Sequence, residues 1–413
     1  APHSSPDGHI PQLRFPEFSG EWGRKLFNNI VDIIDGDRGV NYPKSNDFFN
    51  DEYCLFLSAK NVTKNGFIFN ETQFITKERD ALLRKGKLSR GDIVLTTRGT
   101  VGQFAFYSDD VLYDNIRINS GMVLLRNNND NLLNSYFFKA CKSFQISRQI
   151  KIVAFGSAQP QLTVKEINKI KISLPAKPEQ QKIAAFLTAV DSKIEQLSKK
   201  QELLGEYKKG LMQQIFSQAI RFRAGDTPGQ PLLPNGNSPS GSDFPNWEEK
   251  RLGDLCEITT GKLDANAMVE GGQYRFYTCA KEYYKIDDYA FDTDALIVSG
   301  NGANVGYIHH YQGKFNAYQR TYVLDSFTDN IVFVKFVLDG YLHKRIMKEK
   351  NEGNTPYIVM GTLTDMKINL PSFSEQTKIS NFLSSIDNKI EQVGKQLDES
   401  KQFKKALLQQ MFV

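Results

Sequence analysis

The sequence predicts an α+β protein: two mixed α/β modules, each followed by a long helix, with the two helices paired as an antiparallel coiled coil about a pseudo-twofold axis. Three observations predict it, namely the chain length, a long segment that occurs twice, and a heptad pattern in both copies. At 413 residues the chain exceeds what one hydrophobic core usually supports. Its apolar fraction of 40% and charged fraction of 24% are typical of a folded globular protein.

The repeated segment is the strongest signal in the sequence. ISLPAKPEQQKIAAFLTAVDSKIEQL, which starts at Ile172, returns as INLPSFSEQTKISNFLSSIDNKIEQV, which starts at Ile368. The two copies align without a gap at an offset of 196 residues, which places Pro175 on Pro371. Two unrelated amphipathic helices would share only their apolar phase. Pro and Asp match within these segments, and Gln213-Gln214 matches Gln409-Gln410 farther on at the same offset, which indicates an internal duplication.

The duplication extends upstream into the two modules, although more faintly. DIVLTTRGTVG at 92–102 resembles DALIVSGNGANVG at 294–306, and both patterns predict a strand followed by a glycine-containing turn. A helix is expected over 134–150 in the first module and over 330–350 in the second, among several short strands. We therefore expect two modules of comparable build.

The domain organisation follows from these patterns, with a Pro, Gly and Ser-rich linker between the halves. The predicted segments are a tail, native or added, at 1–12, a first α/β module at 13–175, a first spacer helix at 176–220, a linker at 221–243, a second α/β module at 244–371 and a second spacer helix at 372–413.

Apolar residues at heptad spacing mark one face of each predicted helix. An isolated amphipathic helix cannot bury such a face, and two equivalent units pair most simply about a twofold axis, which makes the helices antiparallel. The alternative is that each helix packs only on its own module. The residues expected to pair the helices are Ile183, Leu187, Val190, Ile194, Leu197, Ile379, Leu383, Ile386, Ile390 and Val393.

Composition and missing motifs exclude several classes of protein. The four cysteines are far apart, so neither a disulfide framework nor a zinc site is expected. No long apolar run predicts a membrane span or a signal peptide, and we expect a cytoplasmic protein. Neither a phosphate-binding P-loop nor an adenine methyltransferase motif of the NPPY type is present. The net charge of +5 suits phosphate binding without proving it.

The segments LPAKPEQQKIAAFLTAVDSKIEQL and KKGLMQQIFS, with their second copies, closely resemble the conserved regions of type I restriction-modification specificity subunits. The resemblance covers nearly the whole chain. It implies a non-catalytic chain whose divergent modules each bind half of a split double-stranded DNA target, and whose helices dock two methyltransferase subunits, to which restriction and translocase subunits are added. It also implies that S-adenosylmethionine, ATP and Mg belong to those partners, with no cofactor and no metal in this chain.

Arg, Lys, Asn and Gln side chains beside glycine-containing turns or strand ends are candidates for DNA contacts, because they form directional hydrogen bonds to base edges and phosphates. For each one a solvated loop residue is an equally good interpretation. The candidates in the first module are Lys60, Asn61, Arg98, Thr100, Arg117, Asn119, Ser157 and Gln159. Those in the second module are Lys281, Asn301, Asn304, Gln319, Arg320, Asn354, Thr355 and Tyr357.

The outer faces of the helices are candidates for the methyltransferase interface, represented by Lys193, Glu195, Lys389 and Glu391. A plain solvated face is the alternative. Two other functions are kept open: a DNA methyltransferase or nuclease with an unrecognised site, and a coiled-coil scaffold that binds DNA without sequence specificity. Methylation by the purified chain alone would favour the first, and equal affinity for all duplexes, or none, would favour the second.

Overall fold

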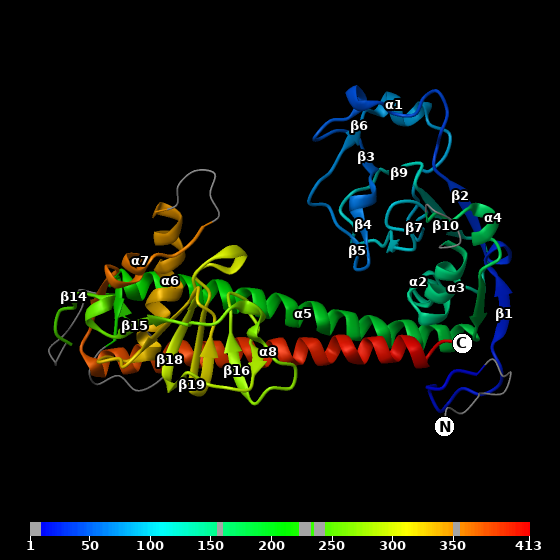
Figure 1. The fold of residues 1–413 in the computed structure, drawn as a ribbon. Coiled ribbons are helices and arrows are strands. Elements are labelled where there is room, and N and C mark those ends of the chain that lie inside the picture. Colours follow the sequence, from blue (N-terminus) through cyan, green and yellow to red (C-terminus); the bar gives the residue numbers. More distant parts are fainter. Residues whose placement is uncertain (1–9, 155–159, 223–232, 235–243, 350–355) are drawn as a thin grey trace. The chain divides into compact units, whose positions relative to one another are not determined.

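The computed structural model describes residues 10–154, 160–222, 233–234, 244–349 and 356–413. The chain forms two units (Figure 1). Unit 1 contains Ala1–Leu197 together with Gln396–Val413, and unit 2 contains Ser198–Lys395. Two long helices, α5 (Lys177–Phe216) and α8 (Phe373–Gln410), each contribute one end to each unit.

Unit 1 is built on a four-stranded sheet with strand order β2-β10-β7-β8. Side chains alternate along its strands, so that Ile93 and Leu95 of β7 face one core while Val94 faces another. A second sheet, β6-β3-β9, covers the face that carries Val94. The strands are β1 Gly23–Leu26, β2 Val31–Asp35, β3 Cys54–Leu57, β4 Val62–Thr63, β5 Gly66–Phe67, β6 Phe74–Ile75, β7 Ile93–Thr96, β8 Phe104–Phe106, β9 Ile116–Ile118, β10 Met122–Asn127 and β11 Lys171–Leu174.

Helices α2 (Asn134–Cys141), α3 (Phe144–Ala154) and α4 (Val164–Ile167) cover the other face of this sheet. The stretch 134–150, predicted as one helix, forms two, because the Ser143 side chain accepts a hydrogen bond from the amide of Ile146 (3.4 Å) and starts a new helix. The helices are α1 Lys77–Leu82, α2 Asn134–Cys141, α3 Phe144–Ala154 and α4 Val164–Ile167.

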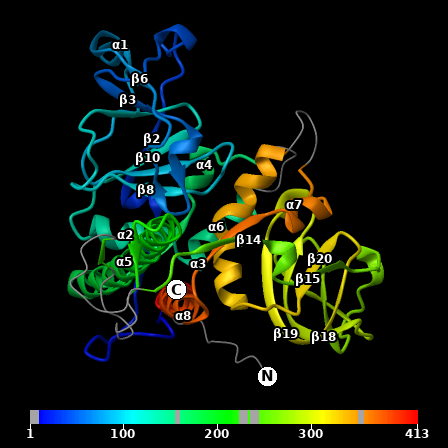
Figure 2. The same ribbon diagram turned by 90° about the vertical axis from the view of Figure 1, so that its left-hand side faces the viewer.

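Unit 2 is built on a six-stranded sheet with order β15-β20-β18-β19-β16-β17. Helix α6 (Ile331–Glu349) packs across one face of it (Figure 2). The remaining elements are β12 Ile220–Arg221, β13 Leu233–Pro234, β14 Glu248–Arg251, β15 Glu257–Thr260, β16 Tyr274–Tyr277, β17 Tyr284–Ile286, β18 Phe291–Ser299, β19 Ile308–Ala317, β20 Thr321–Asp325, α7 Met360–Thr364 and β21 Lys367–Leu370.

The two modules share one topology. The order β2-β10-β7-β8 in unit 1 matches β15-β20-β18-β19 in unit 2. Each module also contains one parallel strand pair. In unit 1 strand β3 pairs with β9, and in unit 2 strand β16 pairs with the last part of β19. The long strand β19 thus takes the place of both β8 and β9. The prediction of two mixed α/β modules of comparable build is confirmed.

The long helices pair inside each unit. In unit 1 the start of α5, at Ile183 and Leu187, shares a core with Leu407 and Met411 near the end of α8. In unit 2 the relation is reversed, because Leu211 and Ile215 near the end of α5 share a core with Ile379 and Leu383 at the start of α8. The helices therefore run antiparallel, as predicted.

Both helices also pack on their modules, so the alternative of a helix that packs only on its own module is wrong. Seven of the residues expected on the seam are buried, whereas Val190, Ile194 and Ile390 are partly exposed. The buried ones are Ile183, Leu187, Leu197, Ile379, Leu383, Ile386 and Val393.

Candidate nucleic-acid interface

A glycine-containing loop follows the central strand of each sheet. In unit 1 it is loop 98–102, between β7 and β8, and the side chains of Arg98 and Thr100 are exposed there. The amides of Thr97 and Arg98 both donate to the carbonyl of Gly121, at 2.8 and 3.2 Å. This anchor fixes the loop to the turn between β9 and β10.

The equivalent loop in unit 2 is loop 301–306, between β18 and β19. Its anchor is the same, because the amide of Gly300 donates to the carbonyl of Arg320 at 2.9 Å. Asn301 forms an isolated β-bridge with Tyr357, whose side chain is 56% exposed. The loop therefore presents a different set of side chains from the same place in the fold.

Glycine is required at two matched positions in these loops. Gly102 and Gly306 have φ values of +84° and +80°, a region that other residues adopt only with strain. A Cβ atom would lie 3.1 Å from Ile150 at Gly102, and 2.8 Å from Ile346 at Gly306. Each loop is thus pressed against a helix of its own module, which holds it in place.

Unit 1 brings two further candidates to this loop. Asn119 lies in the anchoring turn, where its side-chain oxygen accepts from the amide of Gly121 at 2.9 Å. Lys60 belongs to the short helical turn at 59–61, and a Cβ atom at Gly99 would lie 3.8 Å from Ala59. Lys60 also forms an exposed ion pair with Glu71 at 2.6 Å.

Unit 2 gathers its candidates in the same way. The Asn304 amide nitrogen donates to the carbonyl of Cys279 at 3.1 Å, which ties loop 301–306 to the segment that carries Lys281. Gln319 and Arg320 are exposed in the turn that anchors the loop, and Gln319 donates to Asp264 at 2.9 Å. The candidates of unit 2 that the structure describes therefore lie around one loop.

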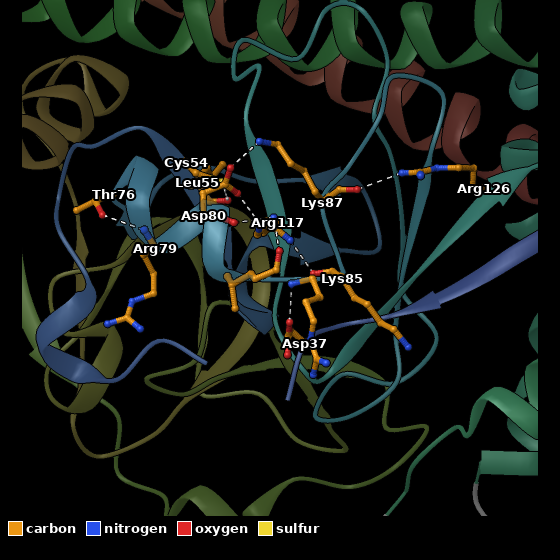
Figure 3. A network of polar contacts seen from close by, with 12 residues as sticks. Asp37, Cys54, Leu55, Thr76, Arg79, Asp80, Lys85, Lys87, Arg117 and Arg126 are labelled. Atoms are coloured by element: carbon orange, nitrogen blue, oxygen red, sulfur yellow. Dashed lines mark hydrogen bonds and ion pairs between the residues drawn. The ribbon is translucent and has the colours of Figure 1, made fainter. Parts of the chain in front are cut away.

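Two candidates are built into the interior instead. Asn61 is 2% exposed and donates to two backbone carbonyls, those of Ile68 and Glu71. Arg117 is 5% exposed, and its Nε atom donates to Asp80 at 2.5 Å (Figure 3). The polar groups of both side chains are hydrogen-bonded within the module, so we propose a structural role for these two residues.

Asp80 is the centre of the network in Figure 3. Burial alone would raise the pKa of Asp80, but hydrogen bonds from Lys87 and Arg117 lower it overall. Arg117 also donates to the carbonyls of Lys85 and Leu83, at 2.7 and 3.0 Å. The network fastens α1 to β9. Four other candidates, Ser157, Gln159, Asn354 and Thr355, lie outside the described residues.

A buried ion pair connects each module to its long helix, and the sequence analysis did not predict it. In unit 1 Arg14 forms two hydrogen bonds with the buried carboxylate of Glu179, at 2.7 and 2.8 Å. In unit 2 Arg221 does the same with Glu375, at 3.1 and 2.7 Å. The signal was present as Leu-Arg-Phe at 13–15 and Ile-Arg-Phe at 220–222, although the second copy lies where a linker was predicted.

The glutamine that follows each of these glutamates forms further hydrogen bonds between the long helix and its module. The Gln180 oxygen accepts from the amide of Leu133 at 2.9 Å, directly before α2, and its nitrogen donates to the carbonyl of Pro175. Gln376 accepts from the amide of Asn330 at 2.9 Å, directly before α6, and donates to Pro371. The repeated Pro-x-x-x-Glu-Gln element thus locks the start of each long helix to its module.

Ion pairs at matched positions bridge the helices. Lys404 of α8 contacts Asp191 of α5 at 2.6 Å in unit 1, and Lys208 of α5 contacts Asp387 of α8 at 2.6 Å in unit 2. Among the described residues, no group of three or more His, Cys, Asp or Glu side chains could hold a metal ion. Within the same residues, no helix has the length and apolarity needed to cross a membrane.

Fold and site together define a duplicated recognition protein. Two modules of one topology hold one loop in the same way, present different polar side chains on it, and are joined to a pair of antiparallel helices. Known proteins of this class identify the family.

The chain belongs to the family of type I restriction modification DNA specificity domains, whose family model matches residues 26–204 and 245–400. It is therefore a specificity subunit, the non-catalytic component of a type I restriction-modification enzyme that recognises the DNA target sequence. The resemblance found in the repeated segments is confirmed.

Relatives agree with this assignment. The EcoDI specificity subunit of Escherichia coli is 41% identical over 39% of this chain and 37% of that protein. The MjaVIII specificity subunit of Methanocaldococcus jannaschii is 25% identical over 81% of this chain and 79% of that protein. The crystal structure of the type I S subunit from M. genitalium has the same fold, with a TM-score of 0.62 at 16% identity, over 98% of this chain and 99% of that one.

Proposed function

We propose that the chain recognises a bipartite, asymmetric DNA sequence, one half through loop 98–102 and its neighbours and the other half through loop 301–306 and its neighbours. The observation that carries the proposal is the matched anchoring of two loops with unlike side chains. A shared frame with different contacts is what two different half-sites require.

The chemistry of the exposed groups supports this proposal. An arginine such as Arg98 suits bidentate contact with guanine, whereas an asparagine such as Asn301 suits adenine. Lys60, Lys281 and Arg320 are exposed cations that suit phosphates. The half-sites should therefore differ in sequence, and the base pairs between them should be spanned without being read.

We further propose that the complex contains two methyltransferase subunits, to which restriction and translocase subunits are added. Lys193, Glu195, Lys389 and Glu391 are all exposed on the long helices and are proposed as parts of the methyltransferase interface. S-adenosylmethionine, ATP and Mg would be bound by the partners, and the complex would act in the cytoplasm, where the DNA is.

Mapping of methylated adenines in a host that carries this subunit with its methyltransferase tests the proposal. We expect methylation within a split motif whose two halves are unlike and are separated by a gap of fixed length. Indiscriminate methylation would support a scaffold without sequence specificity. Methylation by the purified chain with S-adenosylmethionine alone would support a hidden catalytic site. Either result would overturn the proposal.

A further inference from the structure

A pocket of about 270 Å³ in unit 1 lies between the start of α3 and the last turns of α8. Its lining is dominated by cations, although both helices contribute polar and apolar groups. The polar residues that matter are Lys142, Ser147, Lys401, Lys404, Lys405 and Gln409.

The carboxylates nearby do not balance these lysines. Asp191 accepts from Lys404 at 2.6 Å but also from Lys139 at 2.5 Å, and Lys401 lies 3.9 Å from Asp398. Among the described residues, Lys142 and Lys405 have no acidic partner within ion-pair distance. The pocket therefore carries a net positive charge that an anion would neutralise.

Lys142 is a partly buried cation. Its Nζ atom lies 4.3 Å from the ring centroid of Phe138 and donates weakly to the carbonyl of Lys64 at 3.4 Å. Burial lowers the pKa of Lys142 to about 8, and repulsion from Lys404 adds to the effect. A desolvated ammonium without a counter-ion is costly, and a bound anion would offset that cost.

Three elements converge on the pocket. Phe144 and Ser147 line it from the first turn of α3, a helix of 11 residues. Lys142 follows the last residue of α2, and the other lysines come from the last turns of α8. Because α2 and α8 end here while α3 begins here, their helix dipoles oppose one another, and the lysines supply the positive charge.

We propose that this pocket binds a backbone phosphate of DNA, outside the bases that the first module reads. The inference rests on the proposed function. Helix α3 begins at the pocket with Phe144, and Ile150, later in the same helix, is the residue that packs against Gly102 of loop 98–102. The rise from Phe144 to Ile150 is about 9 Å at roughly 1.5 Å per residue. That distance corresponds to about three base pairs at roughly 3.4 Å per pair.

The arrangement is particular to the first half of the chain. At the offset of the internal repeat, Lys142 corresponds to Leu338 and Lys401 corresponds to Gly205. Lys404 and Lys405 correspond to Lys208 and Lys209, which keeps only part of the charge. The additional phosphate contact is therefore expected beside the half-site of module 1 alone.

The test measures DNA affinity against salt concentration for the complex of this chain with its methyltransferase subunits. Loss of one phosphate contact should lower the slope of log affinity against log salt by about 0.9. We expect this loss in Lys142→Gln and in Lys405→Gln, with the sequence preference unchanged, because phosphate contacts carry no base information. Lys142→Arg and Lys405→Arg should retain the wild-type slope.

The duplication supplies the control. Lys209→Gln removes the same charge at the matched position of the other helix, where Leu338 replaces Lys142, and should leave the slope unchanged. Unchanged slopes in both pocket variants would overturn the inference, as would an equal loss in Lys209→Gln. Melting temperatures of the complexes show whether the variants fold.

Two other ligands are outcomes of the same experiment. If the pocket variants keep the slope but lose the methyltransferase subunit on purification, the pocket binds an acidic segment of that partner, and the inference is overturned. If the pocket variants keep the slope, and inorganic phosphate raises the melting temperature of the wild type but not of Lys142→Gln, the ligand is a free anion, with the same consequence. Split-site methylation by the wild type would survive each of these results, so the proposed function stands or falls separately.

Discussion

Glu179 and Glu375 are buried carboxylates at the starts of the two long helices, 2% and 0% exposed. A buried charge is tolerated when it is paired and hydrogen-bonded, and each of these carboxylates receives two hydrogen bonds from one arginine. In unit 2 the indole nitrogen of Trp247 adds a third, at 3.2 Å. The arginines lie far from the glutamates in sequence, so the ion pair fastens the start of each half to its end.

Arg221→Ala should destabilise unit 2 strongly, because it leaves the carboxylate of Glu375 buried with little compensation. Breaking a buried pair on one side costs roughly 3 kcal/mol or more. Thermal or denaturant unfolding of the chain measures the loss. Arg251→Ala is the matched control, since Arg251 pairs with Asp365 at the surface, with side chains 63% and 58% exposed. A similar loss in both variants would contradict the role given to the buried ion pair.

The pKa of Lys142 predicts a pH dependence of DNA affinity. Phosphate binds the protonated amine, and in the free protein that amine is half deprotonated at about pH 8. Affinity should therefore be flat well below this pH and fall as the pH rises through it, whereas Lys142→Arg should remain flat. Burial also raises the pKa of Cys141 far above this window, so its thiol stays neutral. The charged groups facing Lys142 are Lys139 of α2, Asp191 of α5 and Lys401, Lys404 and Lys405 of α8.

Fluorescence anisotropy of a labelled duplex between pH 7 and 9 would measure this dependence. A wild-type curve that stays flat, or an arginine variant that falls equally, would contradict the assignment to Lys142.

Among the elements, the contact between each of the two loops and its covering helix holds the side chains that we propose to read DNA. Gly306 and Ile346 form this contact in unit 2, as Gly102 and Ile150 do in unit 1. Both isoleucines lie at the offset of the repeat, so the contact was duplicated with the module. The loops can differ in sequence because glycine and helix, rather than the variable side chains, define their course.

Gly306→Ala should weaken recognition of one half-site and destabilise unit 2. The added methyl would lie 2.8 Å from Ile346 in a backbone conformation with φ of +80°, so the loop must move. A strained backbone of this kind costs roughly 1–3 kcal/mol. Gly302→Ala isolates the contribution of the backbone, because φ there is +77° but nothing lies within 4 Å of the added atom.

Half-site affinity and melting temperature should both fall further in Gly306→Ala than in Gly302→Ala. Replacement of Ile346 by Ala in the first variant should recover part of the affinity. Equal losses in the two glycine variants would show that helix α6 does not position the loop.

For the whole molecule, the duplication predicts that the two halves are separable in function. Each module is tied to a long helix by the same Glu and Gln contacts, and each helix contributes to both units. A foreign module that carries an arginine in the place of Arg14 could therefore use the contacts already present in α5.

Exchange of residues 1–175 for the corresponding part of another specificity subunit should change one half of the methylated sequence and leave the other half and the gap unaltered. The physical reason is that loop 301–306 and its anchors lie wholly within unit 2. Mapping of methylated adenines reads both halves at once. A chimera whose two half-sites both change would show that the modules do not read independently.

The sequence by itself determined the duplication, the strands and the two long helices, because the offset and the periodicity of apolar residues are visible along the chain. Tertiary structure decided which polar residues remain available. Arg98 and Arg117 look alike in sequence, yet one is exposed on a loop while the other is 5% exposed and bound to Asp80. Tertiary structure also determined that Arg14 and Arg221 pair with glutamates more than 150 residues away in the sequence. Periodicity is a local property, whereas burial and pairing depend on which distant segments come together when the chain folds.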